Sequence, residues 1–223
     1  MNLSDLHRRL LADVLSIGTP YPLVITGGYA VQAHGLVDRL SQDIDVATEN
    51  PAPMAAIAED LQRGLADRGW RVTVISVDPL SARLLVASPD TGEDCEVDVL
   101  KENFWASPEL TEHGPVLAFD DVIGTKVRAL ADRGAVRDLI DVHAAADSRT
   151  LQDLERLGER HGRGEFRLQD LRERLGGAEW FDDDEFAAYG LTPDETEALR
   201  IWAQLWVSDL DQRLTGATED HEG

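Results

Sequence analysis

The stretch that most constrains this chain is an apolar run ending in two adjacent glycines, Val24-Ile-Thr-Gly27-Gly28. Such a run predicts a buried strand over residues 22–26 that leads into a tight turn, and the sequence from Tyr29 predicts a helix leaving that turn. Glycine lets backbone N–H groups approach an anion because no Cβ stands in the way, and the N-terminal end of a helix carries partial positive charge. The turn at Gly27 and Gly28 is therefore a candidate phosphate-binding site.

A pair of aspartates follows this turn. Asp43 and Asp45 are two positions apart on a predicted short strand, so both carboxylates project from one face while Ile44 and Val46 point into the core. Carboxylate oxygens about 7 Å apart along a strand suit one or two Mg²⁺ ions that also hold substrate phosphates. The pair is therefore a candidate metal site.

Taken singly, these features have simpler interpretations, because two glycines after a strand are often just a turn and Asp-x-Asp is often a solvated strand face. Their order is more informative: a strand, Gly-Gly, a helix, and then Arg-x-Ser-x-Asp-x-Asp. This arrangement resembles the nucleotidyltransferase superfamily, and more closely its AbiEii-like, MenT-type toxins. The residues that fit the toxin signature are Gly27, Gly28, Ala30, Arg39, Ser41, Asp43 and Asp45.

The resemblance implies an α+β nucleotidyltransferase fold, a mixed and mainly antiparallel sheet flanked by helices. It also implies transfer of a nucleoside monophosphate from Mg-NTP to an acceptor hydroxyl, with Asp43 and Asp45 bridging metal and triphosphate. The Gly27–Gly28 turn and Ser41 would hold phosphate oxygens, and Arg39 would either clamp the aspartates or contact a phosphate. In the toxin group the acceptor is commonly an RNA, notably the 3′ end of tRNA, and an antitoxin protein restrains the toxin.

A third carboxylate is expected from a later strand. Three strands are predicted, with a hairpin turn between the last two, over residues 71–77, 82–87 and 94–100. In the last strand Glu96 and Asp98 lie on the face opposite Cys95, Val97 and Val99. The resemblance makes Asp98 a candidate metal ligand or the acceptor of the proton from the attacking hydroxyl. The alternative is a charge on an edge strand that faces water.

A later cluster is similar to a second motif of the same family, at Lys126, Ala129, Leu130, Arg133, Arg137, Asp138 and Asp141. The long ammonium side chain of Lys126 suits the β- and γ-phosphates of a nucleotide, which makes it a candidate catalytic and nucleotide-binding residue. Asp138 and Asp141 share one helical face and are expected to form a local brace or a second acidic site. Arg137 lies four positions before Asp141 and could pair with it, and Arg133 is a further accessory candidate. Without the resemblance, this segment is an ordinary charged helix.

The chain of 223 residues is long enough for one large domain or two small ones. We expect a catalytic domain over residues 1–110 and a helical domain over 111–223, with an irregular connection over 101–118. No apolar run approaches the roughly 20 residues needed to span a bilayer, and the N-terminal segment has no signal-peptide character, so we expect a cytoplasmic protein. A single cysteine, Cys95, agrees with a reducing compartment.

The net charge of −22 is difficult to reconcile with an RNA acceptor, because binding to a phosphate backbone normally uses clustered lysine and arginine. A local basic site on an acidic body is possible, since Lys126, Arg128, Arg133 and Arg137 lie close together in the sequence. A nucleotidyltransferase with a small acceptor, of the antibiotic-modifying kind, is an alternative. Kinase-like use of the same fold and a non-catalytic nucleotide-binding module are two others.

Overall fold

The computed structural model describes residues 1–38 and 41–219. They belong to two compact units, Met1–Val122 and Ile123–Gly223, and each unit is described by itself. The boundary expected from the sequence lies at residue 110, whereas the strands between Glu109 and Val116 join the sheet and so belong to the first unit.

Within its described residues the first unit contains a seven-stranded mixed sheet in the order β3-β4-β5-β2-β1-β7-β6. The strands are β1 (Val24–Ile25), β2 (Asp43–Thr48), β3 (Arg71–Asp78), β4 (Ser81–Ala87), β5 (Asp94–Lys101), β6 (Glu109–Thr111) and β7 (Gly114–Val116). The β2–β5 and β1–β7 pairs are parallel and the other pairs are antiparallel. The expected α+β architecture, with a mixed and mainly antiparallel sheet, is therefore confirmed.

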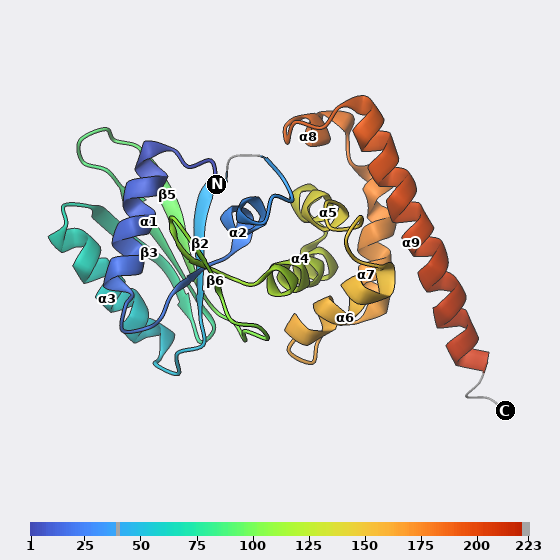
Figure 1. The fold of residues 1–223 in the computed structure, drawn as a ribbon, viewed down its shortest axis with the longest axis horizontal. Coiled ribbons are helices and arrows are strands. Elements are labelled where there is room, and N and C mark those ends of the chain that lie inside the picture. Colours follow the sequence, from blue (N-terminus) through green and yellow to red (C-terminus); the bar gives the residue numbers. More distant parts are fainter. Residues whose placement is uncertain (39–40, 220–223) are drawn as a thin grey trace. The chain divides into compact units, whose positions relative to one another are not determined.

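Helices lie on both faces of this sheet. Helices α1 (Asp5–Ile17) and α3 (Met54–Asp67) lie on one face, and the short helix α2 (Gly27–Ala33) lies on the other (Figure 1). The side chains between the sheet and the α1–α3 layer are fully buried and include Leu10, Ile44, Val46, Leu61, Leu84, Val97 and Val99. Burying each such side chain stabilises the fold by roughly 1.5–3 kcal/mol. One face of the sheet therefore forms the core, and the polar side chains of the strands lie on the other face.

The expectation of an irregular connection over residues 101–118 is confirmed for residues 102–108 and wrong for the segment from Glu109 to Val116. Strands β6 and β7 form a hairpin there, and β7 pairs with β1 through Ile25 and Val116. Both strands have only three residues, which is too short for the period-two alternation that indicates a strand. Pro115 is also unfavourable in a strand, because proline has no N–H to donate to a neighbouring strand.

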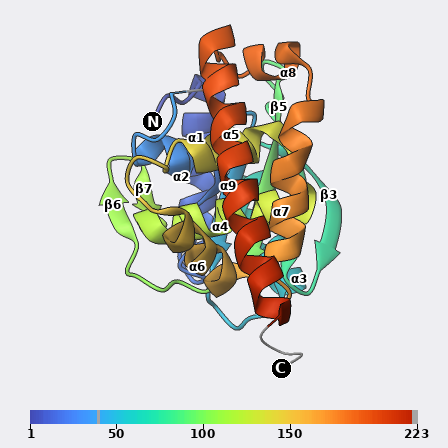
Figure 2. The ribbon, with the colours of Figure 1, turned by 90° about the vertical axis from the view of Figure 1, so that its right-hand side faces the viewer.

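The second unit is helical in its described part. Its helices are α4 (Phe119–Arg133, which begins in the first unit), α5 (Val136–His143), α6 (Leu151–His161), α7 (Leu168–Gly176), the 3₁₀ helix η1 (Gly177–Trp180), α8 (Asp183–Ala187) and α9 (Pro193–Glu219). Helices α7 and α9 pack side by side (Figure 2). The buried side chains of this unit include Leu154, Leu171, Phe186, Leu199, Trp206 and Leu210. No helix in the described part of the chain is both long and apolar enough to cross a membrane.

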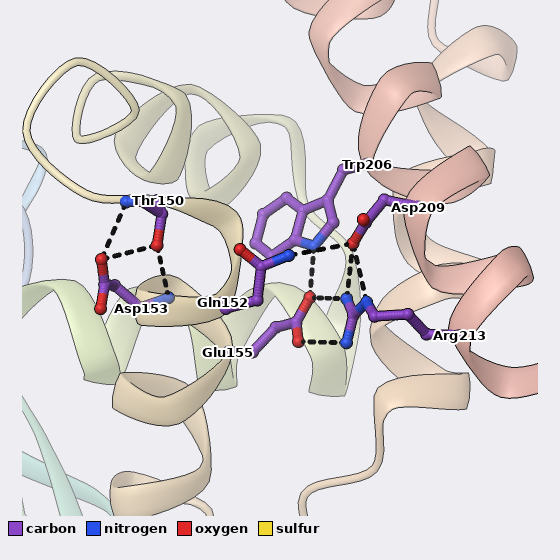
Figure 3. Close-up of polar contacts among 7 residues, drawn as sticks. All are labelled: Thr150, Gln152, Asp153, Glu155, Trp206, Asp209 and Arg213. Atoms are coloured by element: carbon purple, nitrogen blue, oxygen red, sulfur yellow. Dashed lines mark hydrogen bonds and ion pairs between the residues drawn. The ribbon is translucent and has the colours of Figure 1, made fainter. Parts of the chain in front are cut away.

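A buried carboxylate ties α6 to α9 in this unit. Glu155 accepts a hydrogen bond from the indole Nε1 of Trp206 at 2.8 Å and is paired with the guanidinium of Arg213, which also contacts Asp209 (Figure 3). Because the Glu155 side chain is 8% exposed, its negative charge is stabilised by these partners rather than by water. The cluster therefore fixes the packing of α6 against α9 through residues that are 51 and 58 positions apart in sequence.

Candidate active site

Asp43 and Asp45 lie on strand β2 with alternating neighbours. The two aspartates are partly exposed, whereas Ile44 and Val46 are fully buried in the core, as the two-residue period of a strand requires. Both carboxylates therefore lie on the face of the sheet opposite the α1–α3 layer. The geometric expectation drawn from the sequence is confirmed.

Gly27 brings the first turn of α2 against this pair. Its φ of +60° lies in the left-handed region, and a Cβ built on it would come within 1.8 Å of Asp45 Oδ2. The neighbouring Thr26 N–H donates to the carbonyl oxygen of Asp45 at 2.9 Å. Helix α2 begins at Gly27, two residues earlier than expected. Glycine is required at this position both by the backbone conformation and by the close approach of a carboxylate.

Ser41 also contacts the pair, because its hydroxyl donates to Asp43 Oδ1 at 2.9 Å and its side chain is buried. This contact orients the carboxylate from the chain segment that leads into β2. Arg39, which the sequence indicates as a clamp or phosphate contact, lies outside the described residues. Its role stays a prediction, as do the phosphate contacts expected of Gly28 and Ser41.

The parallel pairing of β2 with β5 brings Asp98 to the site. Asp98 lies directly across from Asp45, and Glu96 lies directly across from Asp43. Neighbouring residues in register project to the same face of a sheet, so four acidic side chains form two adjacent rows. The alternative of an edge-strand charge does not hold, because β5 lies between β2 and β4.

Arg83 is a member of this site that the sequence interpretation missed. It lies across from Asp98 on β4, and its Nε and terminal nitrogen donate to the two oxygens of Asp98 at 2.7 and 2.6 Å. These hydrogen bonds with Asp98 raise the pKa of the guanidinium. The sequence feature that could have indicated Arg83 is the alternation of polar and apolar residues along β4, because Arg83 lies between the buried residues Ala82 and Leu84.

The residues at the site fit a divalent cation held partly by substrate. Among the residues that the structure describes, no three His, Cys, Asp or Glu side chains are grouped so that they could hold a metal ion by themselves. Mg²⁺ is commonly bound by one or two carboxylates together with water and substrate phosphates, rather than by a complete protein cage. Asp43 and Asp45 supply such a donor pair, whereas Asp98 is held by Arg83.

The later motif forms a second charged cluster, within the helical unit. Lys126 on α4 places its Nζ 2.8 Å from Asp141 and 3.8 Å from Asp138. Arg133 makes two hydrogen bonds to Asp138, at 2.6 and 2.9 Å. Asp138 and Asp141 have no exposed side-chain surface, and their contacts with Lys126 and Arg133 join α5 to α4. The partly buried Arg137 stays an accessory candidate.

Comparisons with known proteins give a family and a fold. Residues 9–214 match the model of the family described as nucleotidyl transferase AbiEii toxin, type IV TA system. The structure is similar to that of JHP933 from Helicobacter pylori, with a TM-score of 0.57 and 17% identity, covering 99% of this chain and 100% of that one. It is also similar to MenT4, a nucleotidyltransferase toxin from Mycobacterium tuberculosis H37Rv, with a TM-score of 0.50 and 18% identity, covering 92% and 91% of the two chains. At these identities the structural likeness concerns the fold. No curated protein matches the chain.

Proposed function

Because the chain belongs to the AbiEii family of nucleotidyltransferase toxins, whose model spans residues 9–214, we propose that it transfers a nucleoside monophosphate from an NTP to a hydroxyl group of an RNA. An acceptor oxygen forms a bond to the α-phosphorus, the bond between that phosphorus and the bridging oxygen breaks, and pyrophosphate leaves. The tRNA 3′ end is the acceptor that we test first.

The observation that carries this proposal is the close approach of Asp45 to Gly27, with Asp43 on the same strand face and Asp98 on the next strand. Asp43 and Asp45 would hold Mg²⁺, which neutralises charge on a triphosphate and on the leaving pyrophosphate. The N–H groups of the turn at Gly27 and Gly28 would meet phosphate oxygens.

Four further residues have proposed roles. Ser41 would keep Asp43 oriented, and Arg39 would contact a phosphate or the aspartate pair. Asp98 would accept the proton of the attacking hydroxyl, because its carboxylate lies beside Asp45 and each of its oxygens has a second lone pair besides the one that accepts from Arg83. The role proposed for Lys126, a contact with nucleotide phosphates, rests on the family resemblance alone, because its ammonium is paired with Asp141 and Asp138 within the second unit.

The test is label transfer from each α-labelled NTP in turn to purified tRNA and to total RNA, with Mg²⁺ and with the metal chelated. Asp43→Asn/Asp45→Asn is the inactivated variant. Asp78→Asn/Asp90→Asn is the matched control, since it removes the same charge from two exposed aspartates of the first unit. We expect label on tRNA with the wild-type protein and with the control, and at least a 1,000-fold lower rate with the inactivated variant.

A small acceptor is the second candidate, and the net charge of −22 favours it because an acidic protein repels a polynucleotide. The same assay without RNA, supplied with hydroxyl-bearing small molecules such as aminoglycosides, separates the two. Aspartate-dependent labelling of such a compound, with RNA left unlabelled, would replace the RNA proposal. Pyrophosphate release distinguishes nucleotidyl transfer from phosphoryl transfer in either case.

The family assignment also names a toxin–antitoxin system, so we propose that an antitoxin protein counteracts this chain in its host. Induced expression should arrest growth with the wild-type protein and not with Asp43→Asn/Asp45→Asn. The neighbouring reading frames, co-expressed one at a time, should include one that restores growth. Equal growth with the wild-type and inactivated proteins would contradict the toxin assignment for this chain.

A further inference from the structure

Arg83 is bound to Glu96 and Asp98, two of the acidic residues that β5 presents on the site face. Its Nε and one terminal nitrogen donate to the two oxygens of Asp98 at 2.7 and 2.6 Å, and its other terminal nitrogen lies 3.0 Å from Glu96 Oε2. Every nitrogen of the guanidinium therefore faces a carboxylate oxygen. A planar fork used in this way fixes the orientation of the carboxylate as well as its position.

The strand register explains why such a counter-charge is needed. Asp45 lies across from Asp98, and Asp43 lies across from Glu96, so β2 and β5 oppose two pairs of like charges. Opposed like charges on neighbouring strands destabilise a sheet. Arg83 is on β4, the strand that flanks β5 on the side away from β2. Its positive charge compensates the negative charges of β5 and so keeps Asp98 beside Asp45.

On the basis of the proposed transfer reaction, we propose that Arg83 is a positioning residue of the site and acts through Asp98. It holds the Asp98 carboxylate in the orientation in which that group receives the proton of the attacking hydroxyl. The contacts support this division of roles, since the Asp98 side chain is 14% exposed and both of its oxygens are held from β4 by Arg83. A misplacement of about 1 Å at a reacting group can lower a rate by about 100-fold.

The variants are Arg83→Gln, Arg83→Lys and the matched control Arg71→Gln. Arg71 is an exposed arginine on the adjacent strand β3, so its replacement removes the same charge from the same sheet. We expect Arg83→Gln to lower kcat roughly 30- to 100-fold, with the KM for NTP changed less than about threefold. Arg83→Lys restores the charge without the fork and should recover part of kcat, and Arg71→Gln should match the wild-type protein.

Two further measurements isolate the route through Asp98. In an Asp98→Asn background, Arg83→Gln should lower kcat by less than about threefold, because the group on which it acts is already gone. The Kd of a non-hydrolysable NTP analogue, measured by calorimetry, should stay within about threefold of the wild-type value in Arg83→Gln, because a positioning role does not use ground-state binding.

The contrary results are equally specific. Full kcat in Arg83→Gln would overturn the inference, and so would losses from Arg83→Gln and Asp98→Asn that multiply in the double variant. A tenfold weaker analogue Kd with unchanged kcat would make Arg83 a phosphate contact instead.

Thermal unfolding shows whether each variant is folded, and Arg83→Lys supplies the comparison if Arg83→Gln is not. Absence of transfer by the wild-type protein would contradict the proposed function itself, whereas wild-type transfer with an equally active Arg83→Gln contradicts only this inference.

Discussion

The carboxylate of Asp45 occupies the space that a side chain on Gly27 would need. A Cβ on Gly27 would come within 1.8 Å of Asp45 Oδ2, and the glycine has a φ of +60°. The two residues come from different elements, the start of α2 and the strand β2. The turn and the acidic strand therefore depend on each other, because a side chain added at Gly27 would have to displace the Asp45 carboxylate.

The first prediction concerns this contact. Gly27→Ala should lower the free energy of unfolding by about 1–2 kcal/mol through the left-handed backbone alone, and should lower transfer about 100-fold or more because Asp45 must move. Gly35→Ala is the matched control, since Gly35 has a φ of +70° and open space where its Cβ would be. Chemical denaturation and initial rates of both variants separate backbone strain from displacement of the carboxylate. Equal losses of activity in the two variants would contradict the role given to the contact.

The second prediction concerns the buried pair of Lys126 and Asp141. Asp141→Asn should lower the free energy of unfolding by on the order of 3 kcal/mol, because it leaves a buried ammonium with Asp138 as its more distant partner, at 3.8 Å. The double variant Asp141→Asn/Lys126→Met removes both charges and should be more stable than the sum of the two single changes predicts. Urea denaturation of the four proteins measures this coupling, and strict additivity would contradict it.

The same double variant tests the nucleotide role of Lys126. If Lys126 contacts the phosphates, the double variant should bind NTP at least tenfold more weakly, although its charges are balanced. If its function is to brace α4 against α5, the Kd should stay within about twofold of the wild-type value. Calorimetric titration with NTP and Mg²⁺ decides between these outcomes.

The sequence was sufficient where the chemistry is local. The alternation of Asp43, Ile44, Asp45 and Val46 predicted the acidic face of β2, and the same alternation predicted the orientation of Asp98. Register between strands is a tertiary property, so the pairing of Asp98 with Arg83 could not be predicted from the sequence. A single arginine in a strand otherwise looks like a solvent-facing residue.

Two other outcomes depend on tertiary packing in the same way. Strands β6 and β7 are stabilised by pairing with β1 rather than by a pattern of their own. Helical spacing suggested a partner for Asp141 within its own helix, but it could not predict that the ammonium of Lys126 reaches Asp141 from a different helix.

The third prediction concerns Glu155, the carboxylate between Trp206 and Arg213 (Figure 3). Glu155→Gln should lower the free energy of unfolding by about 1–3 kcal/mol, because an amide NH₂ group would face the guanidinium where a carboxylate oxygen now accepts. Glu159→Gln, on the exposed side of the same helix, removes the same charge and should change stability by less than about 0.5 kcal/mol. Urea denaturation followed by far-UV circular dichroism compares the two. Similar losses in both variants would mean that net charge, rather than this buried cluster, determines the effect.

The last prediction concerns His7, whose Nδ1 is hydrogen-bonded to the Tyr29 hydroxyl in the core of the first unit. Burial lowers the pKa of His7 below its ordinary value of 6.5, against the opposing charges of Asp43 and Glu93. The unfolded chain therefore takes up a proton at His7 as the pH falls through about 6.5, while the folded chain does not, and stability decreases toward acid. His143 has a pKa lowered by burial as well and contributes in the same direction.

The measurement is urea denaturation at several pH values between 7.5 and 5.5. The free energy of unfolding of the wild-type protein should fall with the pH, and that of His7→Gln should fall less. The difference should be about 1 kcal/mol for each pKa unit by which folding lowers the His7 pKa. The comparison uses slopes rather than absolute stabilities, because the replaced hydrogen bond to Tyr29 alters stability at every pH. A slope in His7→Gln identical to that of the wild-type protein would show that His7 is protonated equally in the folded and unfolded chains, and that burial beside Tyr29 does not hold it neutral.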